Sequence, residues 1–324
     1  MRSKLLGALG LFVCISCASA VHSQPNNPPV SQTTCSESAC PIQKPHTTER
    51  KEQAAEPPKI LSTPPETETV AQCPVGMIYV QGEYCPTVRQ TCLYAVDANG
   101  NKIPFSKPFK NKLGKTIKWP DRCGEWKYPT ECLSKKIHKS FCIDKYEYPN
   151  IKDHIPQSWM SWHDVKAVCE AQGKRLCNKS EWTFACEGPD MKPYPYGDGY
   201  HRDKTACNFD RTNYQTADCM PVKDKTGKMV PQSTDAPCRI RLDNLLVPSG
   251  SQPACVSPFG VYDMVGNIDE EVVNETHIPY RSGLVGGHVF GVRNACRPMT
   301  EAHEPEFFWY ETGGRCCDNS KASD

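Results

Sequence analysis

The number and distribution of cysteines constrain this chain more than any other feature of its sequence. Of the 20 cysteines in 324 residues, 16 lie between Cys73 and the C-terminus. No Cys-x-x-Cys spacing occurs among these 16, so a zinc ribbon has little support. An even number of cysteines in an exported chain predicts a disulfide framework without a free thiol. We therefore expect a folded part that begins near Cys73 and is tied together by disulfides.

The first 20 residues have the pattern of a secretory signal. Basic residues in Met1–Lys4 precede an apolar run over Leu5–Ile15, and small residues follow at Ala18-Ser-Ala20. The run is too short to cross a bilayer as a mature helix. Cleavage after Ala20 fits the small-residue rule, and Ser16-Cys17 equally fits a bacterial lipidation site. The sequence thus predicts export to the periplasm or cell envelope, with a lipid anchor at the membrane if Cys17 is the modified residue.

Residues 21–72 are expected to form a disordered, proline-rich linker. They contain nine prolines and no Phe, Trp or Tyr, so they bury too little apolar surface to offset the entropy of folding. The folded domain is expected over residues 73–324. Within it, residues 85–135 are rich in Lys, Pro and Gly and contain four cysteines, which predicts a disulfide-linked insertion. A strand is expected from Cys73 to Val80, followed by a turn at Gln81-Gly82.

Two helices in succession are predicted between residues 161 and 188. Ser161 can cap the first helix, and Gly173 can end it in a left-handed turn. Asn178 followed by Glu181 has the spacing of a capping box at the start of the second helix. Gly188-Pro189 then prevents that helix from continuing.

The sequence around these helices resembles the sulfatase-modifying-factor family, typified by the formylglycine-generating enzyme. The resemblance is carried by residues 160–188 together with Tyr194-Pro-Tyr-Gly197, Phe259–Asn267 and Gly313-Gly-Arg315. It implies an α+β protein with a C-type-lectin-like fold, in which a small twisted antiparallel sheet, two helices and long loops are held by disulfides.

The copper site of the family is incomplete in this chain. The resemblance implies that two thiolates hold a copper ion that activates dioxygen, and soft sulfur ligands suit Cu(I). The corresponding segment, Val285–Arg297, contains Cys296 alone. An ungapped alignment replaces the first ligand by Gly291, whereas a gapped alignment deletes both ligands. Copper binding is therefore not expected, and Cys296 with His288 are the candidates for a rearranged catalytic site.

The resemblance also implies that cysteines of the two helices are bonded to the C-terminal strands. A bond between the adjacent Cys316 and Cys317 would strain the peptide, so each needs a separate partner. The implied pairs are Cys169 with Cys316 and Cys186 with Cys296. Cys317 then needs another partner, and Cys177 is the candidate.

A calcium site is a further implication of the resemblance. Asn208, Asp210, Asn267 and Glu270 stand where the family uses oxygen ligands on irregular loops, which suit Ca²⁺. The alternative is that the asparagines satisfy the backbone of turns.

These observations predict a non-catalytic, exported module that binds a protein, peptide or glycan at the cell envelope. The alternative is a copper-dependent formylglycine-generating or related oxidase with a rearranged active site. A net charge of +1 gives no indication of nucleic acid as a partner.

Overall fold

The computed structural model describes residues 73–110, 114, 116–118, 121–211, 222–223, 225, 229–230, 244–291 and 293–319. Every described residue belongs to the compact unit Pro65–Asp324. The predicted signal peptide, Cys17 and the linker at 21–72 therefore lie outside the described residues. Within the described part of the chain, no helix is long and apolar enough to cross a membrane.

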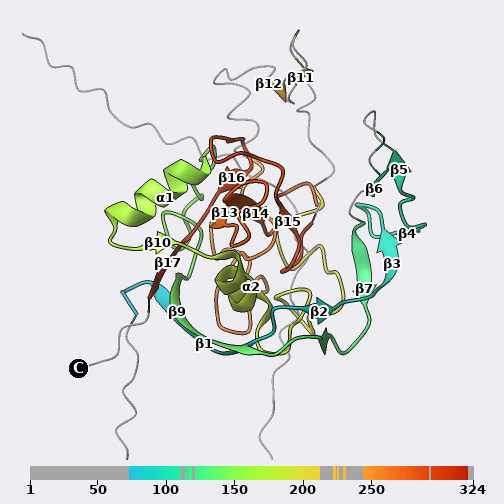
Figure 1. Ribbon diagram of the computed structural model, residues 1–324, viewed down its shortest axis with the longest axis horizontal. Coiled ribbons are helices and arrows are strands. Elements are labelled where there is room, and N and C mark those ends of the chain that lie inside the picture. Colours follow the sequence, from blue (N-terminus) through green and yellow to red (C-terminus); the bar gives the residue numbers. More distant parts are fainter. Residues whose placement is uncertain are drawn as a thin grey trace, which may run out of the picture. The chain divides into compact units, whose positions relative to one another are not determined.

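The first sheet has four strands in the order β1-β9-β17-β10 (Figure 1). Strand β1 (Met77–Tyr84) pairs antiparallel with β9 (Ile137–Asp144) along its full length. Strand β17 (Cys316–Asn319) pairs with the other edge of β9, and β10 (Arg175–Leu176) pairs with β17. The chain's C-terminal strand is therefore a central strand of this sheet.

The expected turn at Gln81-Gly82 is wrong, because both residues lie within β1. Gln81 is paired with Ser140, and Gly82 with Lys139. A Cβ atom at Gly82 would lie 3.2 Å from the ring of Phe184. Glycine at this position of the strand makes room for the helix side chain of Phe184, which packs against the sheet.

Both predicted helices are confirmed. Helix α1 (Trp162–Ala171) begins with a capping box between Ser161 and Asp164, and Gly173 follows it with φ +70°. Helix α2 (Lys179–Glu187) begins after Asn178, whose backbone N–H donates to the Glu181 carboxylate at 2.9 Å. It ends at Gly188, φ +69°.

The second sheet has the order β15-β14-β13-β16. Strand β13 (Asp269–Val273) pairs antiparallel with β14 (Ser282–Val285) and parallel with β16 (Thr312–Gly313). Strand β15 (Met299–Thr300) pairs with the outer edge of β14. Almost every residue of β13 and β14 is buried, so this sheet forms the interior of the domain and positions the candidate site.

The insertion consists of short strands tied by two disulfides, Cys85–Cys132 and Cys92–Cys123. Strand β3 (Cys92–Val96) lies between β4 (Lys102–Ile103) and β7 (Cys123–Trp126). The other pairs are β2 (Val88–Arg89) with β8 (Glu131–Cys132), and β5 (Phe109–Lys110) with β6 (Thr116–Ile117). Elsewhere β11 (Val222–Lys223) pairs with β12 (Met229–Val230).

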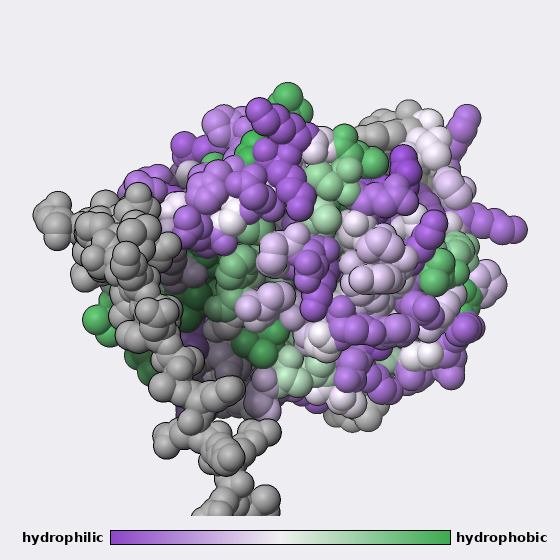
Figure 2. Space-filling view, turned by 90° about the horizontal axis from the view of Figure 1, so that it is seen from below, coloured by the Kyte–Doolittle hydropathy of each residue, from purple (hydrophilic) through white to green (hydrophobic). Residues whose placement is uncertain are grey.

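The main core lies between the first sheet, helix α2 and the second sheet. Trp182 and Phe184 of α2 are fully buried against Val80 and Phe141 of the first sheet and Val272 of the second. Figure 2 shows one face of the molecule, on which apolar residues reach the surface as patches among hydrophilic ones. The buried aromatic side chains thus fix where the second sheet lies relative to the first.

Candidate functional site

Seven disulfides are present among the described residues, and they include the two pairs that the resemblance implies and the candidate pair of Cys177 with Cys317. These are Cys169–Cys316, Cys177–Cys317 and Cys186–Cys296. The other four are Cys73–Cys142, Cys85–Cys132, Cys92–Cys123 and Cys207–Cys255. Cys219 and Cys238 lie outside the described residues.

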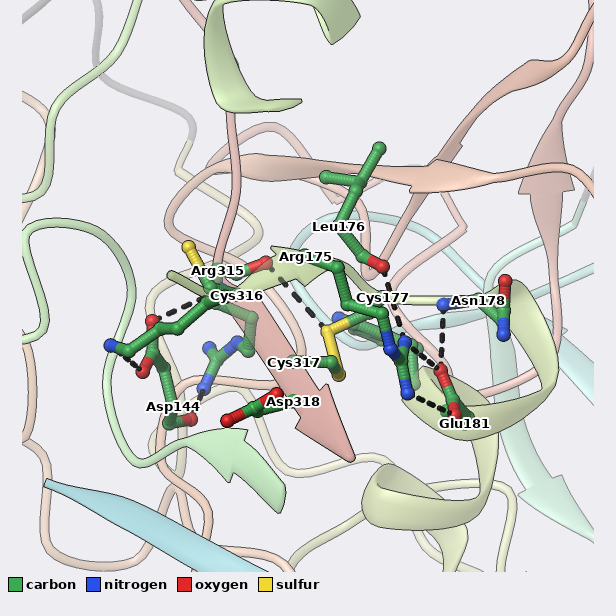
Figure 3. The surroundings of a disulfide bond; sticks show 12 residues. Asp144, Arg175, Leu176, Cys177, Asn178, Glu181, Arg315, Cys316, Cys317 and Asp318 are labelled. Carbon is green, nitrogen blue, oxygen red and sulfur yellow. Dashed lines mark hydrogen bonds and ion pairs between the residues drawn. A yellow bond between two sulfur atoms is a disulfide. The ribbon is translucent and has the colours of Figure 1, made fainter. Parts of the chain in front are cut away.

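The adjacent cysteines Cys316 and Cys317 bond to opposite sides of β17. Cys316 is bonded to α1 through Cys169, and Cys317 to the segment before α2 through Cys177. Beside the Cys177–Cys317 bond, Arg175 makes two 2.7 Å contacts to the Glu181 carboxylate (Figure 3). The start of α2 is therefore held to the sheet by a covalent bond and an ion pair.

Cys296 is a structural cysteine in this protein. Its side chain is fully buried and bonded to Cys186 of helix α2. Its backbone N–H donates to the Pro193 carbonyl at 2.9 Å. A disulfide sulfur is not a thiolate and cannot serve as a Cu(I) ligand or as a redox nucleophile.

The position that the ungapped alignment gives to the first copper ligand has no free space for a side chain. Gly291 has φ +77°, and a Cβ atom built there would lie 1.8 Å from Oδ1 of Asp210. Asp210 is itself held by Arg122 and Arg202, with nitrogen to oxygen distances of 2.9 Å. Because this ion-pair network fills the space, a cysteine does not fit at Gly291.

The second catalytic candidate, His288, lies in a group of charged side chains at one end of the second sheet. Its Nε2 is 3.3 Å from Oε2 of Glu311, and its Nδ1 is buried without a hydrogen-bond partner among the described residues. Atoms of Asp269, His288 and Glu311 lie within 4.8 Å of one another. Arg293 donates to Asp269 at 2.8 Å. His288 and Cys296 thus have separate partners.

Glu271 lies two residues after Asp269, on the same face of β13. Burial, reinforced by the charge of Asp269, raises the pKa of Glu271 well above its usual value. Two buried carboxyl groups therefore share this face of the strand and influence each other's protonation.

Two of the four predicted calcium ligands are bonded to each other. The side-chain amide of Asn208 donates to Oδ1 of Asn267 at 2.8 Å. Oδ1 of Asn267 also accepts from the backbone N–H of Val247 at 3.0 Å, and Asn267 itself has φ +60°. Oδ1 of Asn208 accepts from Arg211 at 2.6 Å. These contacts are those of residues that hold turns.

The two predicted carboxylate ligands of calcium pair with different arginines. Asp210 accepts from Arg122 and Arg202. Glu270 forms a two-point contact with Arg315, with both nitrogen to oxygen distances at 2.7 Å. The two carboxylates thus lie in separate hydrogen-bond environments, and a calcium ion that bound them would compete with guanidinium groups. Calcium binding stays a prediction.

Arg315 holds a buried ionic centre that the sequence did not reveal. Its side chain is 1% exposed and also donates to the Tyr262 carbonyl at 2.9 Å. Its partner Glu270 accepts a third hydrogen bond from the Trp182 indole at 2.9 Å. The Gly313-Gly-Arg315 motif marks this residue, but nothing local in the sequence identifies its partner.

Two further carboxyl groups lie near this ion pair. Glu147 accepts from Ser249 at 2.9 Å, and burial, followed by the charges of Asp263 and Glu270, raises its pKa well above the usual value. Burial also raises the pKa of Asp263 to about 6, although the Gly250 N–H and Arg315 oppose the rise. The guanidinium group of Arg315 thus lies near three buried carboxyl groups, those of Glu270, Glu147 and Asp263. The pKa values of Glu147 and Asp263 are raised by burial.

A hollow of about 270 Å³ lies beside residues 293–298. The insertion closes one side of it. Arg122 of the insertion donates to the Phe290 carbonyl at 2.7 Å, and the Tyr194 hydroxyl donates to the Cys123 carbonyl at 2.5 Å. Aromatic and cationic side chains line the hollow. They are those of Phe105, Lys118, Arg122, Trp126, Tyr194, Arg202 and Arg293.

Residues 96–320 match the model of the sulfatase-modifying factor enzyme 1-like domain. This chain belongs to the sulfatase-modifying-factor family. The predicted α+β, C-type-lectin-like fold of the formylglycine-generating enzyme is therefore confirmed.

Among curated proteins, the chain is similar to a Bos taurus protein named inactive C-alpha-formylglycine-generating enzyme 2. The two are 27% identical over 128 residues, which is 39% of this chain and 33% of the relative. The match thus spans about a third of the relative's length.

Two solved structures also resemble the chain at low sequence identity. CarF is 12% identical with a TM-score of 0.40, and the alignment covers 76% of this chain and 98% of CarF. PvdO from Pseudomonas aeruginosa is 15% identical with a TM-score of 0.38, and the alignment covers 67% of this chain and 99% of PvdO.

Proposed function

We propose that this chain is an exported, non-catalytic member of the sulfatase-modifying-factor family that binds a peptide segment of an envelope protein. The Cys186–Cys296 disulfide carries the non-catalytic part, because it removes the remaining cysteine of the copper segment from chemistry. The name of the Bos taurus relative, which includes the word inactive, supports the same conclusion. The seven disulfides support an oxidising compartment outside the cytoplasm.

The hollow beside residues 293–298 is the proposed binding site. Phe105 and Lys118 of the insertion are exposed and line it. Arg293 also lines it and is paired with Asp269, as Lys118 is with Asp121. Aromatic and arginine side chains contribute most of the binding energy in many protein interfaces. A short peptide with an apolar side chain matches the exposed ring of Phe105, and its polar groups can bond to the ion pairs around it.

The rival function is an oxidase that uses Cys296 and His288. It is tested by incubating the protein with Cu(I), dioxygen and a sulfatase-type Cys-x-Pro-x-Arg peptide, followed by mass spectrometry of the peptide. We expect no aldehyde from the wild type. We also expect none from Cys186→Ser, which frees Cys296 but supplies only one thiolate. Turnover by the wild type that Cys296→Ser abolishes would overturn the non-catalytic proposal.

The binding site is tested by selecting displayed peptides on the wild-type protein. Selected peptides are then measured against Phe105→Ala, which alters the hollow, and against Tyr128→Ala, an exposed aromatic residue that does not line it. We expect Phe105→Ala to weaken binding and Tyr128→Ala to leave it unchanged. No selected peptide, or equal binding by both variants, would contradict the peptide proposal, and binding on a glycan array would replace it.

A further inference from the structure

Asp269, His288 and Glu311 form the most concentrated group of metal-ligating side chains in the described part of the chain. One ligand atom from each lies within 4.8 Å of the others. Asp269 is fully buried, His288 is 8% exposed, and the Glu311 side chain is 17% exposed. The non-catalytic function proposed above uses none of them.

The backbone of the second sheet brings the three residues together. Asp269 begins β13, and its N–H donates to the Glu311 carbonyl at 2.7 Å. Glu311 immediately precedes β16, which is parallel to β13. His288 lies in the loop that follows β14, the other neighbour of β13. Side chains placed by paired strands are held more rigidly than side chains on free loops.

The spacing between the imidazole and the carboxylate matches that of two ligands on one metal ion. With metal to ligand bonds of about 2.0 to 2.1 Å, two tetrahedral ligands are about 3.3 Å apart. Nε2 of His288 and Oε2 of Glu311 are 3.3 Å apart. His163 and Glu306 have the same spacing, so the distance alone does not identify a site, and the distinguishing features here are the burial and the third carboxylate of Asp269.

Two buried polar atoms beside this group lack partners among the described residues. One is Nδ1 of His288, and the other is Oε2 of Glu271, which shares the Asp269 face of β13. Buried polar atoms are nearly always satisfied, and an exception calls for a bound ion, a water or a ligand. Oε2 of Glu271 can accept a hydrogen bond from a water on an ion bound at Asp269, whereas Nδ1 of His288 lies across the ring from Nε2 and needs a separate partner.

Arg293 does not fill the site. It donates to Oδ2 of Asp269 at 2.8 Å, while the contact to Oδ1 is longer, at 3.5 Å. A metal-bound carboxylate commonly accepts such a hydrogen bond on its second oxygen, which fixes its orientation. Oδ1 is therefore the oxygen available to an ion.

We propose that Asp269, His288 and Glu311 bind one divalent transition-metal ion. One imidazole with two carboxylates favours Zn²⁺, Mn²⁺ or Fe²⁺ over Ca²⁺, which prefers oxygen ligands alone. Three protein ligands leave one coordination position open to water or to a group from a partner.

The test uses the full mature chain, freed of metal with a chelator and with any thiols blocked by iodoacetamide. Zn²⁺ binding is measured by equilibrium dialysis, and Co²⁺ absorption reports the coordination. The site variants are His288→Ala and the isosteric Glu311→Gln. His163→Ala is the matched control, because His163 and Glu306 are also 3.3 Å apart but are exposed.

We expect one Zn²⁺ per wild-type chain. We also expect visible absorption bands typical of Co²⁺ with a low coordination number. Both site variants should bind at least about tenfold more weakly, since loss of an outer partner alone costs about 10- to 100-fold. The control variant should bind like the wild type. Absence of stoichiometric binding, or tight binding retained by either site variant, would overturn the proposal. Neither result bears on the copper argument, which depends on Cys296.

Discussion

Replacing Asp263 by Asn should make the stability of the protein less dependent on pH. Asp263 is 2% exposed and has φ +58°, a left-handed conformation that Asn tolerates well. Its Oδ2 accepts from the Gly250 N–H at 2.7 Å, and an Asn carbonyl oxygen can keep this hydrogen bond. The substitution therefore removes the ionisable group with little other change.

The size of the effect follows from the pKa of Asp263, which burial raises from 3.8 to about 6 in the folded protein. As pH rises, the unfolded chain loses this proton first, so unfolding becomes easier. The stabilisation is complete below the unfolded value of 3.8 and is lost as pH rises to about 6. The full difference corresponds to about 3 kcal/mol, and most of it falls between pH 4 and pH 7.

The assay is urea unfolding of the oxidised protein at pH 4 and at pH 7. Relative to the wild type, Asp263→Asn should gain about 2 kcal/mol of unfolding free energy between these two pH values. Asp153→Asn is the control, because Asp153 has φ +61° but is exposed. A difference between Asp263→Asn and the wild type that does not change with pH, or that changes in the opposite direction, would refute the reasoning.

Three further predictions follow from the site. Gly291→Ala should cost about 2 kcal/mol more than Gly173→Ala in thermal or urea unfolding, because both glycines have positive φ but only Gly291 abuts another side chain. Equal losses of unfolding free energy in the two variants would show that the ion-pair network around Gly291 shifts to accommodate a side chain. Replacing Cys186 and Cys296 together by Ala should lower the free energy of unfolding by about 4 kcal/mol, given their separation of 110 residues, and a loss below about 1 kcal/mol would contradict a structural role. The calcium prediction requires a calcium-dependent rise in the melting temperature of the wild type that Glu270→Ala abolishes; without that rise, the observed hydrogen bonds alone account for the predicted ligands.

Local features of the sequence were predicted well because their causes lie within a few residues. The capping box at Ser161 depends on Asp164 three residues away, and the end of α1 depends on the left-handed conformation of Gly173. The turn expected at Gly82 was wrong for the complementary reason. A glycine also suits a strand when a distant side chain, here Phe184, needs the space.

The sequence by itself determined the family, the two helices and the absence of a second cysteine in the copper segment. Only the tertiary structure decided what the remaining polar residues do. Asp269 and Glu311 are 42 positions apart and become neighbours because β16 pairs in parallel with β13. Glu270 and Arg315 are 45 positions apart, and they form a buried ion pair only in the folded protein. Ion pairs and candidate metal ligands of this kind depend on which strands pair and in which register, and no local pattern in the chain encodes that choice.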